Sequence, residues 1–216
     1  MSSAMSSRIC RFGPLDVAYD ERVLVPRPWT LAQSRWAADV ATAAGPGPLL
    51  ELCAGVGHIG LAAAVLADRD VVQVEADPVA AAFALANAER AGWAGRVEVR
   101  VERLERALQP EERFPVVIAD PPYLRTSDVD RFPDDPRLAI DGGRDGLGIV
   151  RACLAVAARH LVPGGALVLQ VAGPGQAEEV AALAGPGFAV GLRVEETRVV
   201  DDERAVMLLR SGPDRA

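Results

Sequence analysis

From Leu49 onward, short apolar runs alternate with helical patterns, and this alternation is the feature that most constrains the fold. Such a chain forms successive strand–helix units, which assemble into a parallel sheet with helices on both faces. We therefore predict an α/β, Rossmann-like fold. The strands are expected at residues 49–53, 71–75, 96–101, 116–119, 166–171, 190–195 and 204–209. The helices are expected at residues 60–67, 77–90, 104–108, 149–160 and 176–184.

The segment before residue 46 follows a different pattern. Residues 23–25 predict a short strand, and Pro26-Arg27-Pro28 then predicts a rigid arm, because each proline fixes its own φ. Thr30 is expected to cap the helix that follows it. This segment contains no sign of a separate amino-terminal domain.

Composition is that of a globular protein, with half of the 216 residues hydrophobic. The net charge of −7 disfavours nonspecific nucleic-acid binding, which needs a basic face, although a local basic patch would still accommodate an RNA or DNA substrate. The cysteines Cys10, Cys53 and Cys153 are spaced too widely to predict a metal site or a disulfide framework. No signal peptide or membrane-spanning run is expected, which predicts a cytoplasmic protein; oligomeric state stays open.

A glycine-rich loop follows the first strand of the alternating region. Gly55, Gly57 and Gly60 form a Gly-x-Gly-x-x-Gly pattern, preceded by Glu51 and followed twenty residues after Gly55 by Glu75. Glycine lets a ligand approach the backbone, and an acid at the end of the second strand accepts hydrogen bonds from ribose hydroxyls. The pattern predicts a nucleoside-containing cofactor, nicotinamide and flavin types included. The structural alternative is a tight turn with a surface glutamate.

Asp120-Pro121-Pro122-Tyr123 follows the fourth strand directly. The two prolines restrict the backbone, so the Asp120 side chain and the nearby carbonyls are held in fixed directions. An acceptor followed by an aromatic ring suits the binding and methylation of a planar nitrogen group, whereas the simpler interpretation is a strand that ends in a capped turn. The polar, glycine-rich stretch 123–148 is expected to close over a substrate.

Several segments together resemble the release-factor glutamine N5-methyltransferases, which are class I S-adenosylmethionine enzymes with an Asn-Pro-Pro-Tyr motif. The resemblance covers roughly residues 12–210 and keeps the order and spacing of the motifs. The segments that carry it are residues 23–28, 51–60, 74–75, 120–123, 135–147, 161–165, Gln176 and 201–204. The resemblance implies a class I methyltransferase fold with a seven-stranded sheet, divided as an arm and helix at 1–45 and a methyltransferase domain at 46–213.

The resemblance also assigns residues to roles, and S-adenosyl-L-methionine is the implied cofactor, with no metal needed. The implied catalytic residues are Asp120, Pro121, Pro122 and Tyr123. The implied cofactor-binding residues are Glu51, Gly55, Gly57, Gly60, Glu75, Glu102 and Asp120. The implied substrate-binding residues are Pro26, Arg27, Pro28 and Tyr123.

Four features depart from that family. Asp120 replaces its catalytic asparagine and is similar to the aspartate of the nucleobase amino methyltransferases; an ionised aspartate is an acceptor only. The family's Glu-Thr-Glu reads Trp29-Thr30-Leu31 here, and Arg103 stands where the adenine-contacting acid is expected, with Glu102 one position away. No counterpart of the helical substrate-recognition domain is found.

Three functions follow from these observations. The first is an N-methyltransferase of a protein or peptide side-chain nitrogen, of the glutamine type by resemblance. The second is an N-methyltransferase of a small molecule or nucleobase amino group, which Asp120 favours. The third is a nicotinamide enzyme or a non-catalytic nucleoside-binding module.

Overall fold

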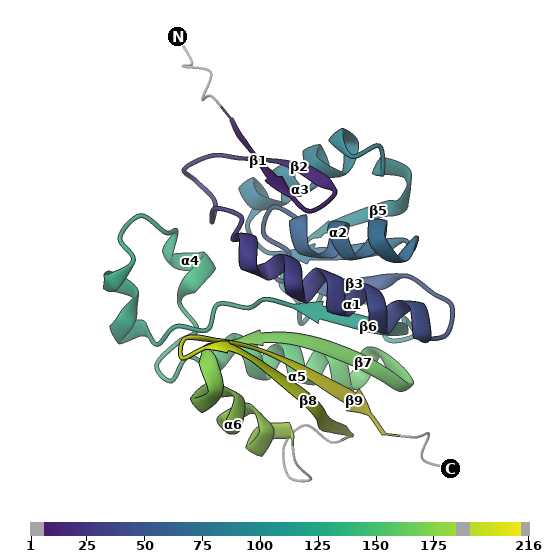
Figure 1. Ribbon diagram of the computed structural model, residues 1–216, viewed down its shortest axis with the longest axis vertical. Helices are drawn as coiled ribbons and strands as arrows, with labels where there is room; N and C mark the ends of the chain where they lie inside the picture. Colours follow the sequence, from purple (N-terminus) through teal and green to yellow (C-terminus); the bar gives the residue numbers. More distant parts are fainter. Residues whose placement is uncertain (1–6, 185–190, 213–216) are drawn as a thin grey trace.

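A single sheet of seven strands organises the computed structural model, which describes residues 7–184 and 191–212. The strand order is β5-β4-β3-β6-β7-β9-β8 (Figure 1). The strands are β3 (Leu49–Leu52), β4 (Val71–Glu75), β5 (Val97–Val101), β6 (Phe114–Ala119), β7 (Leu161–Val171), β8 (Leu192–Asp201) and β9 (Arg204–Ser211). The first five strands in this order pair in parallel, whereas β9 is antiparallel to both β7 and β8. The predicted α/β, mostly parallel sheet is confirmed.

The strand order reverses between β3 and β6. The chain runs outward from β3 through β4 to β5, and then returns to the other side of β3 as β6. Leu52 and Ala119, the last residues of β3 and β6, are paired. The segments that follow these two strands, the glycine loop and Asp120, are therefore brought together at the edge where open α/β sheets bind ligands.

Helices cover both faces of the sheet (Figure 1). The helices are α1 (Leu31–Ala43), α2 (His58–Ala67), α3 (Pro78–Arg90), α5 (Gly148–His160) and α6 (Gly173–Ala184). One core cluster contains side chains of α5 and α6, and the other contains side chains of α1, α2 and α3. Because side chains alternate along a strand, Leu50 and Leu52 belong to the first cluster and Leu49 to the second. No helix among the described residues is long and apolar enough to cross a membrane.

Sequence signals explain where α3 begins. Asp77 caps α3, since its Oδ1 accepts a hydrogen bond from the Val79 N–H at 2.9 Å, and Pro78 is the first helical residue. The helix α5 ends at His160, whose Nδ1 lies 2.9 Å from the Glu112 carbonyl oxygen.

A hairpin of β1 (Arg8–Phe12) and β2 (Leu15–Tyr19) precedes the arm and packs beside α3 (Figure 1). The Asn87 side chain on α3 fixes the hairpin. Its Oδ1 accepts from Ala18 N at 2.7 Å, and its Nδ2 donates to Ala18 O at 3.1 Å and to Val56 O at 3.0 Å. This hairpin, which the sequence interpretation did not include, is tied both to α3 and to the loop before α2.

The stretch between β6 and α5 forms a lobe at the side of the molecule (Figure 1). It holds the short helical turns η3 (Thr126–Arg131) and α4 (Arg137–Ile140). Its two ends are joined by backbone hydrogen bonds from Leu124 N to Ile140 O at 3.0 Å and from Gly142 N to Leu124 O at 2.8 Å. We call residues 123–148 the lid segment.

Three local predictions are wrong. Residues 23–25 form no strand, since the chain is irregular from Glu21 to Arg27 and turns into η1 (Pro28–Thr30). Residues 104–108 form turns rather than a helix, because Pro110 follows too closely for a stable helix to form. Thr30 precedes α1, but its hydroxyl donates to the Arg27 carbonyl at 2.8 Å instead of capping the helix.

Two further expectations concern boundaries. The strand expected from residue 166 begins at Leu161, and Val190, the first residue of the strand expected at 190–195, lies outside the described residues. The division at residues 45 and 46 stays a prediction. Residues 1–6 of the first predicted part (1–45) and residue 213 of the second (46–213) also lie outside the described residues.

Candidate active site

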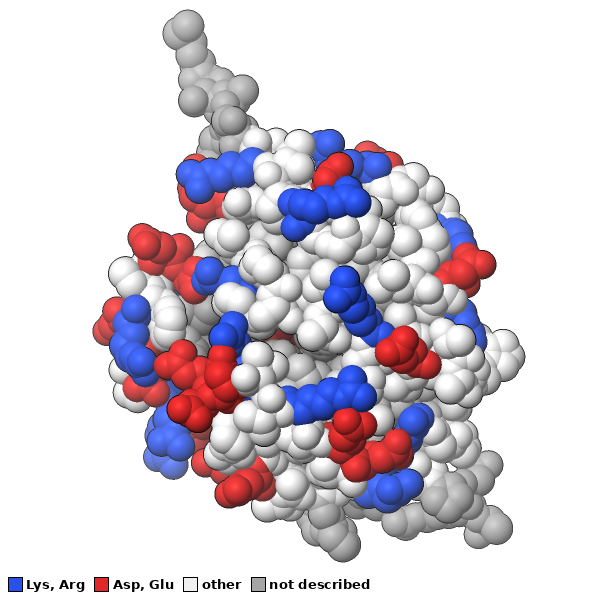
Figure 2. All heavy atoms as spheres, in the orientation of Figure 1, with Lys and Arg blue, Asp and Glu red and all other residues white. Residues whose placement is uncertain are grey.

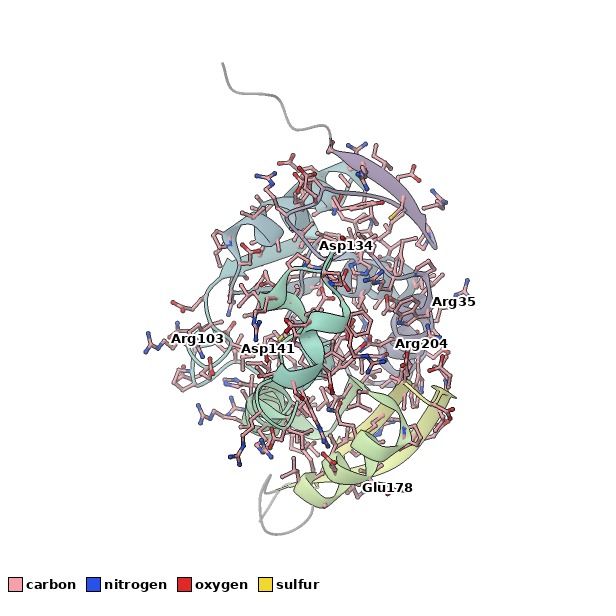
Figure 3. The ribbon with its side chains drawn as sticks, turned by 90° about the vertical axis from the view of Figure 1, so that its left-hand side faces the viewer. Arg35, Arg103, Asp134, Asp141, Glu178 and Arg204 are labelled. Carbon is pink, nitrogen blue, oxygen red and sulfur yellow. The ribbon has the colours of Figure 1, made fainter. Side chains whose placement is uncertain are left out.

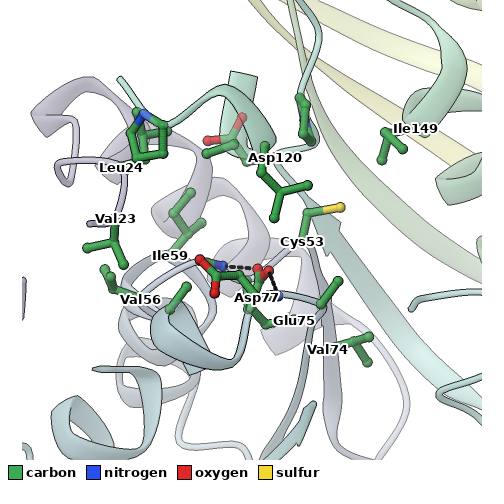
Figure 4. A pocket seen from close by; sticks show the side chains of 18 of the residues that line it. Val23, Leu24, Cys53, Val56, Ile59, Val74, Glu75, Asp77, Asp120 and Ile149 are labelled. Atoms are coloured by element: carbon green, nitrogen blue, oxygen red, sulfur yellow. Dashed lines mark hydrogen bonds between the residues drawn. The ribbon is translucent and has the colours of Figure 1, made fainter. Parts of the chain in front are cut away.

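A cavity of about 530 Å³ lies at the carboxyl ends of β3, β4, β5 and β6 (Figure 4). Six segments line it, namely the arm, the glycine loop, the end of β4, the end of β5, the Asp120 turn and the lid segment, together with Ala80 of α3 and Ile149 of α5. The lining residues are Arg22–Val25, Arg27, Thr30, Cys53–Val56, His58, Ile59, Val74–Asp77, Ala80, Glu102–Glu105, Asp120, Pro122, Pro136–Ala139, Asp141 and Ile149. Parts of the chain more than a hundred residues apart therefore form one site.

The glycine loop has the backbone geometry that its sequence predicts. Gly55 and Gly57 have φ values of +54° and +78°, which side-chain-bearing residues rarely adopt. A Cβ atom at Gly57 would lie 2.7 Å from Gln73 Oε1 and 2.9 Å from the Ala84 Cβ, whereas a Cβ at Gly55 would meet nothing within 4 Å. Gly57 therefore allows close packing below the loop, and Gly55 leaves its upper side open to the cavity.

Cys53, the residue after β3, also has a positive φ, of +58°. Its thiol faces the Cys153 thiol of α5, and this contact together with burial raises the pKa of Cys53. Cys153 is fully buried, as expected for a small core residue, but Cys53 lines the cavity (Figure 4).

Glu51 lies beneath the loop and does not line the cavity. Its Oε1 accepts from Gly60 N at 2.7 Å, and its Oε2 accepts from Gln73 Nε2 at 2.6 Å. Burial raises the pKa of Glu51 to about 8, and these two hydrogen bonds oppose that rise. A Cβ at Gly60 would collide with the Glu51 carboxylate. Glu51 and Gly60 therefore support the glycine loop from below.

Glu75 ends β4 beside the open side of the loop (Figure 4). Its Oε2 accepts from Gly55 N at 2.6 Å, and its Oε1 accepts from Asp77 N at 2.8 Å. Burial raises the pKa of Glu75, while these hydrogen bonds lower it. Each oxygen retains acceptor capacity for the hydroxyls of a bound ribose.

Glu102 and Arg103 follow β5, and both line the cavity. The Glu102 carboxylate accepts from Arg103 N at 2.8 Å, which holds the glutamate at the cavity. The Arg103 side chain is 67% exposed and points away from the molecule (Figure 3). The Arg103 side chain therefore does not fill the cavity at the end of β5.

Asp120 lies directly after β6 and projects into the cavity (Figure 4). Burial raises the pKa of Asp120 to about 7, so the carboxyl titrates near neutral pH. The preceding carbonyl, of Ala119, accepts a hydrogen bond from Gln33 Nε2 at 2.9 Å, and the same amide donates to Val168 O at 3.2 Å. The buried side chain of Gln33 on α1 thus fixes the end of the strand that carries Asp120. Sequence analysis gave no signal for this role.

The other residues of the Asp-Pro-Pro-Tyr turn divide between two cavities. Pro122 lines the large cavity and the buried Pro121 does not, while Tyr123 lines a smaller cavity of about 210 Å³ beside α6. Burial and then the Asp120 charge raise the pKa of Tyr123. The Tyr123 carbonyl accepts from Gln176 Nε2 at 3.0 Å, and the same nitrogen donates to Gly146 O at 3.3 Å. Gln176 therefore ties the Asp120 turn to the end of the lid segment.

Arg27 is the one residue of the Pro26-Arg27-Pro28 arm that lines the cavity; Pro26 is buried and Pro28 is exposed. Its guanidinium forms an ion pair with Asp135 of the lid segment at 2.6 Å. The Arg27 and Arg204 guanidinium carbons lie 5.7 Å and 4.4 Å from the centre of a Trp29 ring, which places Trp29 between the arm and the β8–β9 turn.

The charge around the site is mixed. Figure 2 shows acidic and basic side chains interspersed on the face of the molecule that it presents, with no continuous basic surface there. Within the cavity, Glu75, Asp77, Glu102, Asp120 and Asp141 supply carboxylates. Asp141 is held by Thr126 Oγ1 at 2.7 Å, and this hydrogen bond lowers its pKa (Figure 3 shows its position in the lid segment).

This arrangement fits a nucleoside cofactor that carries positive charge. The cavity has room for such a molecule, Glu75 offers ribose acceptors at an open glycine loop, and Asp120 offers an acceptor at the same cavity. Across the described ranges, no group of three His, Cys, Asp or Glu residues could hold a metal ion.

Comparison with known proteins finds similarity to glutamine methyltransferases. The family model "Conserved hypothetical protein 95" matches residues 36–132. A release factor glutamine methyltransferase of Clostridium acetobutylicum is 29% identical over 213 residues, covering 94% of this chain and 73% of the relative. A ribosomal protein uL3 glutamine methyltransferase of Burkholderia pseudomallei is 33% identical over 167 residues, covering 70% of this chain and 54% of the relative. The chain thus spans only part of these curated relatives.

The fold has close counterparts among solved structures. The crystal structure of a methyltransferase from Pyrococcus furiosus superimposes with a TM-score of 0.66 at 22% identity, covering 93% of this chain and 90% of the other. At this identity the likeness establishes the fold, and the predicted methyltransferase-type sheet is the one observed.

Proposed function

We propose that this chain, a class I S-adenosylmethionine-dependent methyltransferase similar to the glutamine methyltransferases, transfers a methyl group to a nitrogen of a protein or peptide side chain. Its fold and its sequence relatives both belong to this class of enzyme. One observation carries the proposal: Gly55, Glu75 and Asp120, from the ends of three strands, line one cavity. A cofactor held at Gly55 and Glu75 would therefore lie beside Asp120.

The protein's own part in the reaction is alignment and charge placement. Bound S-adenosylmethionine supplies an activated sulfonium methyl group, so no metal is required. Ionised Asp120 accepts a hydrogen bond from the substrate N–H and directs the nitrogen toward the methyl position. With the cofactor bound and its methyl group transferred to the substrate nitrogen, Asp120 or solvent would take the proton that this nitrogen loses. Pro122 lines the same cavity as Asp120, whereas the predicted roles of the Pro121 carbonyl as second acceptor and of Tyr123 as contact for the planar group involve residues outside that lining.

Two relatives support a side-chain amide as the substrate. Their names share glutamine as the methylated residue but differ in the protein that carries it, a release factor in one and ribosomal protein uL3 in the other. We therefore propose glutamine-type nitrogen as the substrate class and leave the carrier protein unassigned. Both named carriers take part in translation, which supports the cytoplasm as the location.

A second substrate class is favoured by one residue. An ionised carboxylate accepts hydrogen bonds without donating any, so Asp120 suits an amine or a nucleobase amino group, which presents several N–H donors. The runner-up function is therefore an N-methyltransferase of a small molecule or nucleobase.

Calorimetric titration with S-adenosylmethionine, S-adenosylhomocysteine and NAD tests the cofactor. Binding of the two sulfur nucleosides without NAD is expected, and binding of NAD alone would overturn the proposal. Transfer of labelled methyl to glutamine peptides, amines and nucleobases then separates the two substrate classes. Glu75→Ala is expected to weaken cofactor binding at least tenfold, whereas the exposed Glu111→Ala, a matched control, should leave it unchanged.

A further inference from the structure

Cys53 is a nucleophilic side chain that the proposed reaction does not use. It follows β3 with a φ of +58°, a conformation that glycine adopts freely and that costs other residues about 1–3 kcal/mol. It also lines the large cavity, and Figure 4 shows its sulfur directed toward the side where Ile149 of α5 lies. Strained residues cluster at functional sites, so the Cys53 side chain is a candidate for a role of its own.

The neighbour of this thiol is Cys153 of α5. Cys153 lies four residues after Ile149, on the same face of the helix, and it is fully buried. The two thiols are in contact, both are free, and Cys53 packs against the core cluster that contains Cys153. The thiol pair therefore joins the end of β3 to α5, and of the two sulfur atoms only the one on Cys53 belongs to a residue that lines the cavity.

We propose that Cys53 and Cys153 form an oxidation-sensitive thiol pair, which hydrogen peroxide converts to a disulfide that weakens ligand binding in the large cavity. This inference concerns the regulation of the site, and it rests on the proposed function for the identity of the ligand.

The oxidation takes two steps. Hydrogen peroxide in the cavity transfers one oxygen to the Cys53 sulfur as the O–O bond breaks, which gives a sulfenic acid and one water. The Cys153 sulfur then attacks the Cys53 sulfur, the S–O bond breaks, and the departing hydroxide takes the Cys153 proton to form a second water. One peroxide is thus reduced to two waters while two thiols are oxidised to one disulfide.

The surroundings of Cys53 make the first step the slow one. Contact with Cys153, and then burial, raise the pKa of the Cys53 thiol, and the Glu75 and Asp120 carboxylates add to the rise. Little of the reactive thiolate is therefore present at neutral pH. The second step needs no diffusion, because the attacking thiol is already in contact. The pair should respond to sustained peroxide rather than to a brief exposure.

Oxidation changes the geometry of the cavity wall. A disulfide bond is about 2.0 Å long, shorter than a contact between unbonded sulfur atoms, so its formation draws the end of β3 and α5 together. The next two backbone N–H groups, of Ala54 and Gly55, donate to Val74 O and the Glu75 carboxylate at the end of β4. Movement of Cys53 strains these hydrogen bonds at the open side of the glycine loop.

The test maps the disulfide and measures binding with the intact chain. Reduced protein is treated with hydrogen peroxide, the remaining thiols are blocked, and linked peptides are identified by mass spectrometry. We expect a Cys53–Cys153 bond and a Kd for S-adenosylhomocysteine that is weaker by about tenfold, both reversed by dithiothreitol. Saturating S-adenosylhomocysteine should slow the oxidation, because it occupies the cavity that Cys53 lines.

Three variants separate this pair from general oxidation. Cys10→Ser removes the partly exposed thiol of β1, and it should still form the disulfide with the same loss of affinity. Cys53→Gly suits the positive φ, and its affinity for S-adenosylhomocysteine should not respond to peroxide. Cys153→Ala serves if the glycine variant does not fold, and it should leave a Cys53 sulfenic acid that dimedone traps.

The absence of a linked peptide in peroxide-treated wild type, or a linked peptide with unchanged affinity, would overturn the proposal. Failure of the reduced wild type to bind S-adenosylhomocysteine would instead overturn the proposed function. Hydrogen exchange of residues 53–57 would then decide the role of the thiol pair, since the proposal requires faster exchange there in the oxidised chain than in the reduced chain.

Discussion

The Nη2 atom of Arg27 lies 2.7 Å and 2.6 Å from the two carboxylate oxygens of Asp135, although the residues are 108 positions apart in the chain. Arg27 belongs to the arm and Asp135 to the lid segment, and both segments line the large cavity. The Asp135 side chain is only 13% exposed, so water screens this ion pair less than a surface pair. The pair therefore fastens the lid segment to the arm.

Arg27→Met should loosen that connection. It leaves the partly buried Asp135 carboxylate without its cation, at a cost of about 1–3 kcal/mol. We expect faster proteolysis within residues 123–148 and a higher KM for the methyl acceptor. Arg11→Met, which breaks the exposed Arg11–Asp16 pair, is the control and should cost less than about 1 kcal/mol. Equal protease sensitivity in both variants would contradict the role of Arg27.

The pKa of about 7 for Asp120 predicts the pH dependence of the reaction. The ionised carboxylate is the stronger acceptor for the substrate N–H and alone can take up the nitrogen proton, so kcat/KM for the acceptor should rise with pH up to about 7 and level off above it. Steady-state rates at saturating cofactor between about pH 5.5 and 8.5 check this. Asp120→Ala should abolish turnover and spare cofactor binding.

Asp120→Asn separates titration from geometry. The variant keeps the shape and one acceptor oxygen but cannot ionise, so any remaining rate should lose the rise below pH 7. Increased activity on glutamine amides relative to amines would mean that Asp120 sets the choice of nitrogen. An unchanged pH profile in this variant would exclude Asp120 as the titrating group.

Much of the fold could be predicted from the sequence, because its signals are local. The apolar run at 116–119 and the run at 71–75 are strands wherever they pair, and Asp77-Pro78 starts a helix without help from distant residues. The missed hairpin had a signal as well, since Gly13 and Pro14 separate two strand-forming runs. Residues 23–25 resemble a strand in composition, but they line the cavity instead of joining the sheet.

The site could be predicted only in part, because the residues that support it are brought together by contacts between distant segments. Gly55, Glu75 and Asp120 follow strands, so a parallel sheet brings them together once its order is known. The residues that hold them depend on contacts between distant segments: Gln33 reaches Ala119 across 86 positions, and Gln176 reaches Tyr123 across 53. No periodicity or spacing encodes such contacts.

Stability should decrease with rising pH because of Glu51. Its pKa of about 8 lies above its ordinary value of 4.5, so between these values the folded state binds more protons than the unfolded state. The stability associated with the neutral carboxyl is complete below about pH 4.5 and is lost as the pH rises toward 8, by at most about 5 kcal/mol.

Glu51→Gln should therefore flatten the pH dependence of the free energy of unfolding. Urea unfolding at about pH 5.5 and pH 8.5 measures the free energy of unfolding of both proteins. The gain in stability of Glu51→Gln over wild type should be larger at the higher pH. Asp120 acts in the same direction up to about pH 7, so part of the slope should remain. Glu111→Gln, at an exposed position, is the control. If Glu51→Gln and wild type keep the same slope, Glu51 does not titrate in this range.

Gln176 offers a test of whether the lid segment positions the Asp120 turn. Its amide nitrogen donates to the carbonyls of Tyr123 and Gly146, and its amide oxygen accepts from Ala172 N at 2.8 Å. Gln176→Leu removes all three hydrogen bonds at similar volume, and we expect it to lower the free energy of unfolding by about 1–3 kcal/mol.

The effect of Gln176→Leu on catalysis should exceed its effect on cofactor binding. Gln176 does not line the large cavity, so the Kd for S-adenosylhomocysteine should change less than twofold. Displacement of the Asp120 turn should nevertheless lower kcat by about tenfold to a hundredfold, because catalysis requires sub-ångström alignment of the acceptor nitrogen. Glu178→Gln, on the exposed side of the same helix, should leave both quantities unchanged. A parallel loss of cofactor binding and kcat would instead indicate that Gln176 stabilises the whole site rather than the turn that carries Asp120.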